Sequence, residues 1–336
     1  MKVLISPRND GYIKTIPILN QTAYFPGSSV RELATMRFHA MFTLHACFFV
    51  VNIYTKISND PGHYRQLNSG ESLISILTCG TTEKYEDVWS HNNYIVYVLE
   101  GRKIWHTANG SYDLQKGSCV FVRKGACIVE QFTDAKFCFI LFFIPDEFIR
   151  DVLKTKSTPI YKAGEEYDPV IPIDRNASIE TFYQSMMLHF DSKRSPDQSL
   201  MELKFRELIL TIADNPVNSE LLSYFWTVLK EPQSVSLQRV MEDNFYFNLK
   251  LEDFAKLSSR SLSAFKRDFF RIYKTSPGKW LMEKRLNYTM HLLTHRGMTV
   301  SETAFESGFK NVSHFSRVFR QRFGTSPASI KLQTAV

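Results

Sequence analysis

In the last third of the chain, apolar residues recur every three or four positions, which is the spacing of one buried helix face. Two segments, 262–273 and 311–323, show this pattern clearly. Their apolar stripes consist of Leu262, Phe265, Phe269 and Ile272 in the first segment and of Val312, Phe315, Phe319 and Phe323 in the second. At about 100° per residue, Arg267 and Arg317 point away from these stripes. The pattern therefore predicts two amphipathic helices that each bury an apolar face and expose an arginine.

These two segments belong to an internal repeat with an offset of 50 residues. Seven of the fifteen positions in 263–277 are identical to their counterparts in 313–327. Each copy begins with a shorter apolar segment, 251–257 or 300–307, and a turn follows it. Each copy is therefore predicted to form a helix-turn-helix motif.

A further helical pattern over 278–295 separates the two copies. About 16 residues at 1.5 Å each make a rod of roughly 24 Å. The second helix of a helix-turn-helix enters the major groove, where an arginine can bond both O6 and N7 of guanine. A rigid spacer of this scale could hold two such helices about one DNA turn, ~34 Å, apart. A single chain is thus predicted to read two adjacent segments of the groove.

Two positions set the backbone of the repeat. Gly308 supplies the tight turn of the second copy, since glycine tolerates a positive φ. Gly324 stands where a left-handed helix cap is wanted, but the first copy has Lys274 at that position. The cap of the first copy is therefore either less favourable or built differently.

Upstream of the repeat, short apolar runs are typical of β-strands. The runs predicted to be strands are 74–78, 94–99, 103–106, 119–122, 127–132 and 137–144. Asn109-Gly110, between Trp105 and Tyr112, is a strong hairpin signal. Several hairpins in succession predict a small barrel or sandwich, whose many phenylalanines leave open whether its interior is packed solid. Helical spacing returns over 177–231 and predicts three helices.

Positive charge is concentrated in the repeat region. Residues 233–336 carry 17 Lys and Arg against 8 Asp and Glu, whereas the rest of the chain carries 24 against 26. A basic segment favours a polyanionic partner, although a solvated surface without a partner would look the same. The five cysteines are odd in number and form no CxxC pair, which fits a reducing cytoplasm. No stretch reaches the ~20 apolar residues of a membrane span, so we expect a cytoplasmic protein without membrane contact.

Catalytic chemistry finds little support in the sequence. His63, His91 and His106 are scattered, without the close His and acid spacing that lets side chains converge on one metal ion. Motifs for a nucleophile, a phosphate loop or a dinucleotide are absent. We therefore expect no catalytic residue, no metal and no cofactor. The alternative is a cupin-type enzyme or small-molecule binding protein whose helical domain only packs against it. Turnover with a bound metal would favour that alternative, and salt-sensitive duplex binding would oppose it.

Residues 233–332 resemble the DNA-binding domain of the AraC/XylS family of bacterial transcription regulators. The C-terminal motif of that family is carried here by Ala304, Gly308, Phe309, Ser313, Phe315, Arg317, Phe319, Gly324, Ser326 and Pro327, and its linker-helix motif by Arg285, Leu286, Leu292 and Leu293. The resemblance implies base contacts from the first turns of the two recognition helices. With the polar residues that flank them, the expected DNA-binding residues are Ser263, Lys266, Arg267, Arg271, Ser313, His314, Arg317, Arg320 and Gln321.

The front of the chain resembles the cupin-type N-terminal domain that many such regulators carry. Its sequence over residues 116–125 is most similar to that of the subgroup that resembles activators of type III secretion genes. The resemblance implies an activator that binds double-stranded promoter DNA, contacts RNA polymerase, forms a homodimer and senses a small-molecule or protein effector.

The expected fold is α+β, with an N-terminal cupin-like β-barrel, a helical middle segment and an all-α C-terminal domain with two helix-turn-helix motifs joined by a linker helix. We expect four parts. Residues 1–66 form an uncharacterised and weakly ordered segment, and residues 67–165 form the cupin-like regulatory domain. Residues 166–232 form a helical linker and candidate dimerisation region, and residues 233–336 form the DNA-binding domain.

Overall fold

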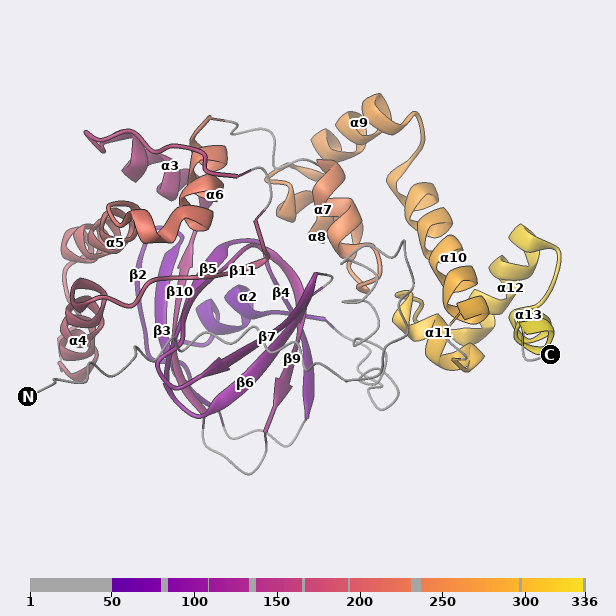
Figure 1. The fold of residues 1–336 in the computed structure, drawn as a ribbon, viewed down its shortest axis with the longest axis horizontal. Coiled ribbons are helices and arrows are strands. Elements are labelled where there is room, and N and C mark those ends of the chain that lie inside the picture. The colour runs from indigo at the N-terminus through magenta and orange to yellow at the C-terminus, as the bar shows by residue number, and fades with distance from the viewer. Residues whose placement is uncertain are drawn as a thin grey trace, which may run out of the picture.

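The computed structural model describes residues 50–79, 84–107, 109–132, 137–164, 167–192, 194–230, 237–295 and 298–334. Figure 1 shows a β-barrel flanked by helices and followed by a series of helices that extends away from it. This arrangement confirms the α+β fold predicted from the sequence.

Two sheets build the barrel. One has the strand order β1-β4-β9-β6-β7, and the other has the order β11-β8-β5-β10-β3-β2. Their bounds are β1 (Val51–Asn52), β2 (Gln66–Ser69), β3 (Ser72–Cys79), β4 (Tyr85–Ser90), β5 (Asn93–Glu100), β6 (Arg102–Thr107), β7 (Gly110–Gln115), β8 (Cys119–Val122), β9 (Gly125–Gln131), β10 (Phe137–Ile144) and β11 (Val170–Pro172). Strands β8 and β10 are buried on both faces, which explains why their sequences are almost continuously apolar.

Four helices cover the outer face of the six-stranded sheet. They are α3 (Asp146–Lys154), α4 (Ala177–Asp191), α5 (Gln198–Ala213) and α6 (Ser219–Lys230). Their apolar residues form one buried cluster with outward-facing side chains of the sheet. Phe142 of β10, for example, meets the ring of Phe205 in α5 edge-on at 4.5 Å between centroids. The three helices predicted after the barrel therefore exist and pack against it.

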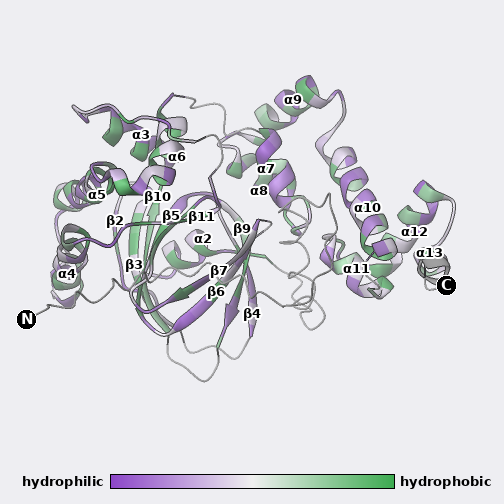
Figure 2. Cartoon of the chain, viewed as in Figure 1, coloured by the Kyte–Doolittle hydropathy of each residue, from purple (hydrophilic) through white to green (hydrophobic). Residues whose placement is uncertain are grey.

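The remaining helices form the C-terminal part of the molecule. They are α7 (Leu237–Asn244), α8 (Leu251–Leu257), α9 (Leu262–Tyr273), α10 (Pro277–His295), α11 (Val300–Glu306), α12 (Val312–Phe323) and α13 (Pro327–Thr334). Helices α7 to α9 share a buried cluster with the five-stranded sheet, which contributes Tyr85, Trp89 and Ile128. A separate cluster around Leu286, Phe315 and Phe319 draws its members from α10 onward. Figure 2 shows hydrophobic and hydrophilic residues alternating along α9 and α10, as amphipathic helices require.

The predicted strands agree with the observed ones. Five of the six apolar runs fall within a strand, the sixth (127–132) extends one residue past the end of β9, and Trp105 pairs with Tyr112 across the hairpin that Asn109-Gly110 predicts. The barrel also draws on neighbouring residues. Within the segment 1–66, predicted to be weakly ordered, residues 51–58 form β1 and α2 (Ile53–Ser58); residues 1–49 lie outside the described part. The division of the chain into four parts stays a prediction.

The expected absence of membrane spans and metal sites can be compared only with the residues that the structure describes. In those ranges, no helix combines the length and the apolar character needed to cross a membrane. The same ranges hold no group of three or more His, Cys, Asp or Glu side chains suited to a metal ion. Cys119 and Cys127 are buried thiols, and burial raises the pKa of each to about 12. These two thiols are therefore protonated at neutral pH.

Candidate DNA-binding surface

Helices α9 and α12 repeat one another at the offset of 50 found in the sequence. Both are preceded by a polar N-cap residue whose side chain accepts a hydrogen bond from the third backbone N–H of the helix. Ser261 accepts from Ala264 and Asn311 from His314. Such a cap stabilises a helix by about 1 kcal/mol, so both recognition helices begin at a defined residue.

The turn before each recognition helix uses a residue with a left-handed backbone. Gly308 has φ of 80° in the second copy, and Ser259 has φ of 54° in the first. Residue 308 must be a glycine because there is no room for a Cβ atom. A Cβ there would lie 2.7 Å from the Tyr246 carbonyl oxygen and 3.1 Å from the guanidinium of Arg285. The second motif therefore approaches its neighbours too closely for any side chain.

The C-terminal caps of α9 and α12 show how the first copy accommodates Lys274 where the second has Gly324. Lys274 has φ of 54° and Gly324 has φ of 75°, so both adopt the left-handed conformation. Their N–H groups donate to the carbonyls of Phe270 and Arg320, respectively. The two caps have the same geometry, and the first imposes it on a residue with a Cβ at a cost of about 1–2 kcal/mol.

The apolar stripes are buried as predicted at their centres. Phe265 and Phe269 of α9 are fully buried, as are Phe315 and Phe319 of α12. The prediction is wrong for Ile272, which is 53% exposed. Tyr273 fills the place expected for Ile272, because it stacks on Phe269 at 4.5 Å between ring centroids and contacts Trp280.

All nine side chains predicted to bind DNA are exposed. They are Ser263, Lys266, Arg267 and Arg271 on α9, and Ser313, His314, Arg317, Arg320 and Gln321 on α12. The side chain of Arg267 is 76% exposed. The structure thus brings these residues together in two groups, one on each recognition helix.

The two groups differ in electrostatics because of Asp268. Its carboxylate lies 3.2 Å from Arg260 and 3.4 Å from both Arg267 and Arg271. Partial desolvation opposes ionisation, but hydrogen bonds from Arg260 and Arg267 outweigh it and lower the pKa of Asp268. In α12 the matching residue is Val318, so the α12 arginines lack an acidic neighbour at that position. Asp268 therefore orients the arginines of α9 and partly offsets their charge.

Helix α10 joins the two motifs. Its 19 residues make a rod of about 28 Å at 1.5 Å per residue. The half-buried Arg285 donates to the carbonyl oxygens of Phe245 at 2.7 Å and of Phe247 at 2.8 Å, and desolvation lowers its pKa to about 10. Glu283 forms an ion pair with Arg322 of α12 at 2.8 Å. The linker is therefore anchored to the residues that precede α8 and to α12.

Sequence reasoning missed the residues that attach the first motif to the barrel. The Lys124 ammonium donates to the Ser259 hydroxyl at 2.9 Å and pairs with Asp146 at 2.7 Å. The backbone N–H of Ala126 donates to the side chain of Asn244 at 2.9 Å. Periodicity reports on one element at a time, so nothing in the pattern joined Lys124 to a residue 135 positions away.

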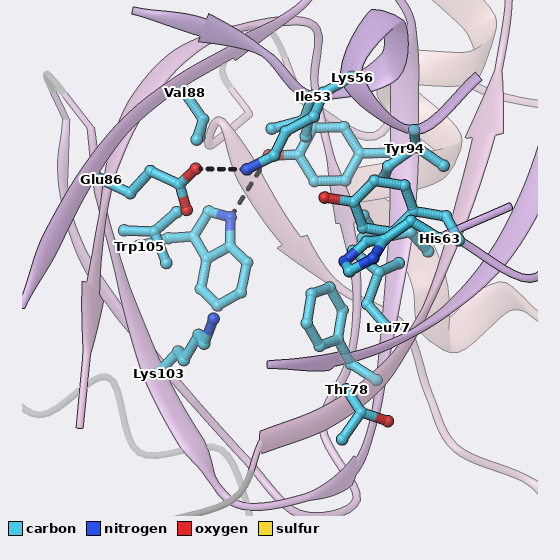
Figure 3. A pocket seen from close by; sticks show the side chains of 15 residues that line it. Ile53, Lys56, His63, Leu77, Thr78, Glu86, Val88, Tyr94, Lys103 and Trp105 are labelled. Atoms are coloured by element: carbon cyan, nitrogen blue, oxygen red, sulfur yellow. Dashed lines mark hydrogen bonds and ion pairs between the residues drawn. The ribbon is translucent and has the colours of Figure 1, made fainter. Parts of the chain in front are cut away.

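A pocket in the barrel is the second candidate site. It encloses about 260 Å³ and is mostly apolar, with walls that include Tyr94, Trp105 and Phe139. Figure 3 shows the pair formed by Lys56 and Glu86, which lie 3.0 Å apart, and the ammonium group of Lys103 among the side chains that line the pocket. Lys103 donates to Gln131 at 2.6 Å. The barrel interior is therefore not packed solid.

Comparisons with known proteins find matches to both the barrel region and the C-terminal helices. Residues 93–224 match the ExsA N-terminal regulatory domain, and residues 254–333 match a helix-turn-helix domain. The thermoregulatory protein LcrF of Yersinia pestis is 26% identical over 249 residues, which cover 73% of this chain and 91% of LcrF. The HTH-type transcriptional regulator ExsA of Pseudomonas aeruginosa is 28% identical over 241 residues, which cover 69% of this chain and 84% of ExsA.

Among solved structures, ToxT from Vibrio cholerae is similar with a TM-score of 0.35 and 13% identity, over 78% of this chain and 98% of ToxT. The paired helix-turn-helix motifs, the ExsA-type N-terminal domain and the relatives that share both make this chain a member of the AraC family of DNA-binding transcription regulators.

Proposed function

We propose that this chain binds double-stranded promoter DNA at specific sequences through α9 and α12 and activates transcription there, without catalysis. One observation carries the proposal. Two matched helices, joined by α10, expose nine polar and basic side chains in a segment with 17 Lys and Arg against 8 Asp and Glu. Base edges and phosphates are the partners that such side chains recognise.

The test is selection of duplexes by the full chain from a randomised library, followed by fluorescence anisotropy on the enriched duplex. Two half-sites about 10 base pairs apart are expected, one for each recognition helix. Affinity is expected to fall steeply with salt, because phosphate contacts release counterions. Failure to enrich any duplex at low ionic strength would contradict the proposal.

Activation is the sign we propose for regulation, with RNA polymerase as the partner. Relatives in Yersinia enterocolitica bear the name virulence regulon transcriptional activator VirF. Transcription with purified RNA polymerase from a template that carries the selected site should rise when the chain is added. A fall in transcript would make the chain a repressor.

The effector we propose enters at the barrel. The pocket of about 260 Å³ suits a small molecule with an apolar body. An acidic end would meet Lys56, which is paired with Glu86, and Lys103, which is bonded to Gln131. Melting the purified chain in the presence of candidate carboxylates should reveal a ligand by a rise in Tm. A protein effector instead would leave Tm unchanged with every small molecule and appear as a co-purifying partner.

We propose a homodimer that forms through α4 and α5. Leu188 of α4 is 71% exposed and Leu203 of α5 is 63% exposed, on two helices that lie side by side. Contiguous exposed apolar patches are typical of association surfaces, and we propose that these two leucines belong to such a patch. Sedimentation should show a dimer for the wild-type chain and a monomer for a variant with Leu188→Asp and Leu203→Asp. A wild-type monomer at all concentrations would exclude this interface.

A further inference from the structure

Phe270 is a large apolar residue in an unexpected place. It is 58% exposed on α9, the first recognition helix, which lies at the periphery of the molecule at the top of Figure 1. Seven residues are about two helical turns, so Phe270 projects within about 20° of Ser263, roughly 10 Å further along the helix. The exposed Lys266 and Arg267 project on either side of that line. Phe270 therefore lies in the middle of the proposed DNA-binding face.

The other exposed apolar residue of α9 provides a contrast. Ile272 is 53% exposed but projects about 180° from Ser263, next to the buried stripe. The internal repeat supplies a second contrast, because the residue of α12 that matches Phe270 is the exposed Arg320. The two recognition helices thus present different chemistry at one position of the same face.

We infer that Phe270 determines the sequence preference of the α9 half-site by packing against the C5-methyl group of a thymine in the major groove. This inference rests on the proposed function. Thymine alone among the four bases presents a methyl group there, and apolar side chains including phenylalanine contact it. The basic residues around Phe270 are complementary to the phosphates on both sides of the groove, so duplex DNA is the partner that the whole face fits. Arg320 makes the matching position of the α12 half-site polar.

The experiment uses the duplex selected by the full chain. Each thymine is replaced in turn by deoxyuridine, which keeps the Watson–Crick edge and removes only the methyl group. For the wild-type chain, one or two replacements in the α9 half-site should weaken binding about fourfold, the effect of one buried methyl group. With Phe270→Ala, binding to the parent duplex should be weaker and the same replacements should have no further effect.

Two variants complete the test. Ile272→Ala removes an equally exposed side chain from the opposite side of α9 and should retain the full deoxyuridine effect. Phe270→Arg gives α9 the residue that α12 has and should abolish the deoxyuridine effect.

The inference is overturned if no thymine in the selected duplex responds to replacement, or if Phe270→Ala responds as strongly as the wild type. It is also overturned if Ile272→Ala abolishes the effect. In each of these cases the chain still selects and binds a duplex, so the proposed function stands. If no duplex is selected, the proposed function fails and this inference fails with it.

Discussion

At the scale of single residues, the repeated arginines are the strongest candidates for base recognition. Arg267 and Arg317 occupy matching positions and are both exposed. We predict that Arg267→Ala and Arg317→Ala each cost about 1–3 kcal/mol of specific binding, because a bidentate contact to guanine is lost. Fluorescence anisotropy on the selected duplex measures the loss.

A matched control separates base contacts from general charge. Lys154→Ala removes an exposed cation from α3, far from the recognition helices, and should leave binding unchanged. Equal losses on selected and scrambled duplexes would reassign the arginines to phosphate contacts, with a salt slope reduced by about one.

The left-handed cap at Lys274 makes a prediction about stability. With φ of 54°, Lys274 adopts a left-handed backbone that is strained for a residue with a Cβ, whereas glycine adopts it without strain. We expect Lys274→Gly to raise the free energy of unfolding by about 0.5–1 kcal/mol, measured by urea denaturation. The reverse change, Gly324→Lys, should lower the free energy by a similar amount.

A control for this prediction is Lys256→Gly, in the helical part of α8. It should destabilise the protein by about 1 kcal/mol, since glycine is a poor helix former. If Lys274→Gly destabilised the protein to the same degree, the left-handed cap would not form in solution.

At the scale of elements, close packing adds to backbone conformation at the turn of the second motif. Gly308 and Gly324 both have positive φ, but an added Cβ meets the Tyr246 carbonyl oxygen at 2.7 Å at the first and nothing within 4 Å at the second. We predict that Gly324→Ala costs about 1 kcal/mol of stability and that Gly308→Ala costs about 1–3 kcal/mol more. Thermal unfolding of both variants isolates the steric part, and equal losses would mean that α11 is free to move away from α10.

The helices of the repeat could be predicted because their causes are local. The apolar period and the capping residues lie within a few turns of chain, the repeat shows the same pattern a second time, and the observed bounds of α9 match the predicted 262–273. Ile272 shows where this reasoning ends. Near the end of α9, burial depends on which neighbour is present, and the ring of Tyr273 reaches Phe269 and Trp280 in its place.

The pattern of apolar residues also could not predict a role for Phe270. A periodic pattern identifies which residues can be buried together, but it assigns no function to an apolar residue that lies on the exposed face of the helix. The contacts between the barrel and the first motif, such as Lys124 with Ser259, also required the folded chain, because they join residues far apart in sequence.

At the scale of the whole molecule, the two motifs are attached differently. The core of the first motif includes Tyr85, Trp89 and Ile128 of the barrel, whereas the cluster around the second is built from α10 onward. Lys124 contributes to the first attachment by donating to Ser259, and its buried pair with Asp146 holds the ammonium group in place. Burial opposes ionisation of Asp146, but the charge of Lys124 outweighs it and lowers the pKa of the carboxyl. The first motif therefore shares a buried core with the barrel, and, within the described part of the chain, the cluster around the second motif does not include barrel residues.

Asp87 makes this interface sensitive to pH. It lies between Tyr85 and Trp89 on β4 and, because side chains alternate along a strand, on the same face as both. Its Oδ1 atom is buried and has no hydrogen-bond partner among the described residues. Burial first, and then the charge of Glu86, raise the pKa of Asp87 from 3.8 to about 7.

The sign of the effect follows from the direction of this shift. Because the folded chain holds the proton more tightly than the unfolded chain, the stabilisation is complete below about pH 4 and is lost as the pH rises through about 7. We predict that Asp87→Asn, which is neutral at every pH, is more stable than the wild type at pH 8 by roughly 2–4 kcal/mol. Urea denaturation between pH 5 and pH 8 should show the wild type losing stability and the variant changing much less.

Asp151→Asn, at an exposed site on α3, should follow the wild-type profile. If the wild type and Asp87→Asn had parallel profiles, the carboxyl group would be hydrated in solution, and the interface between barrel and first motif would be open to water at that point.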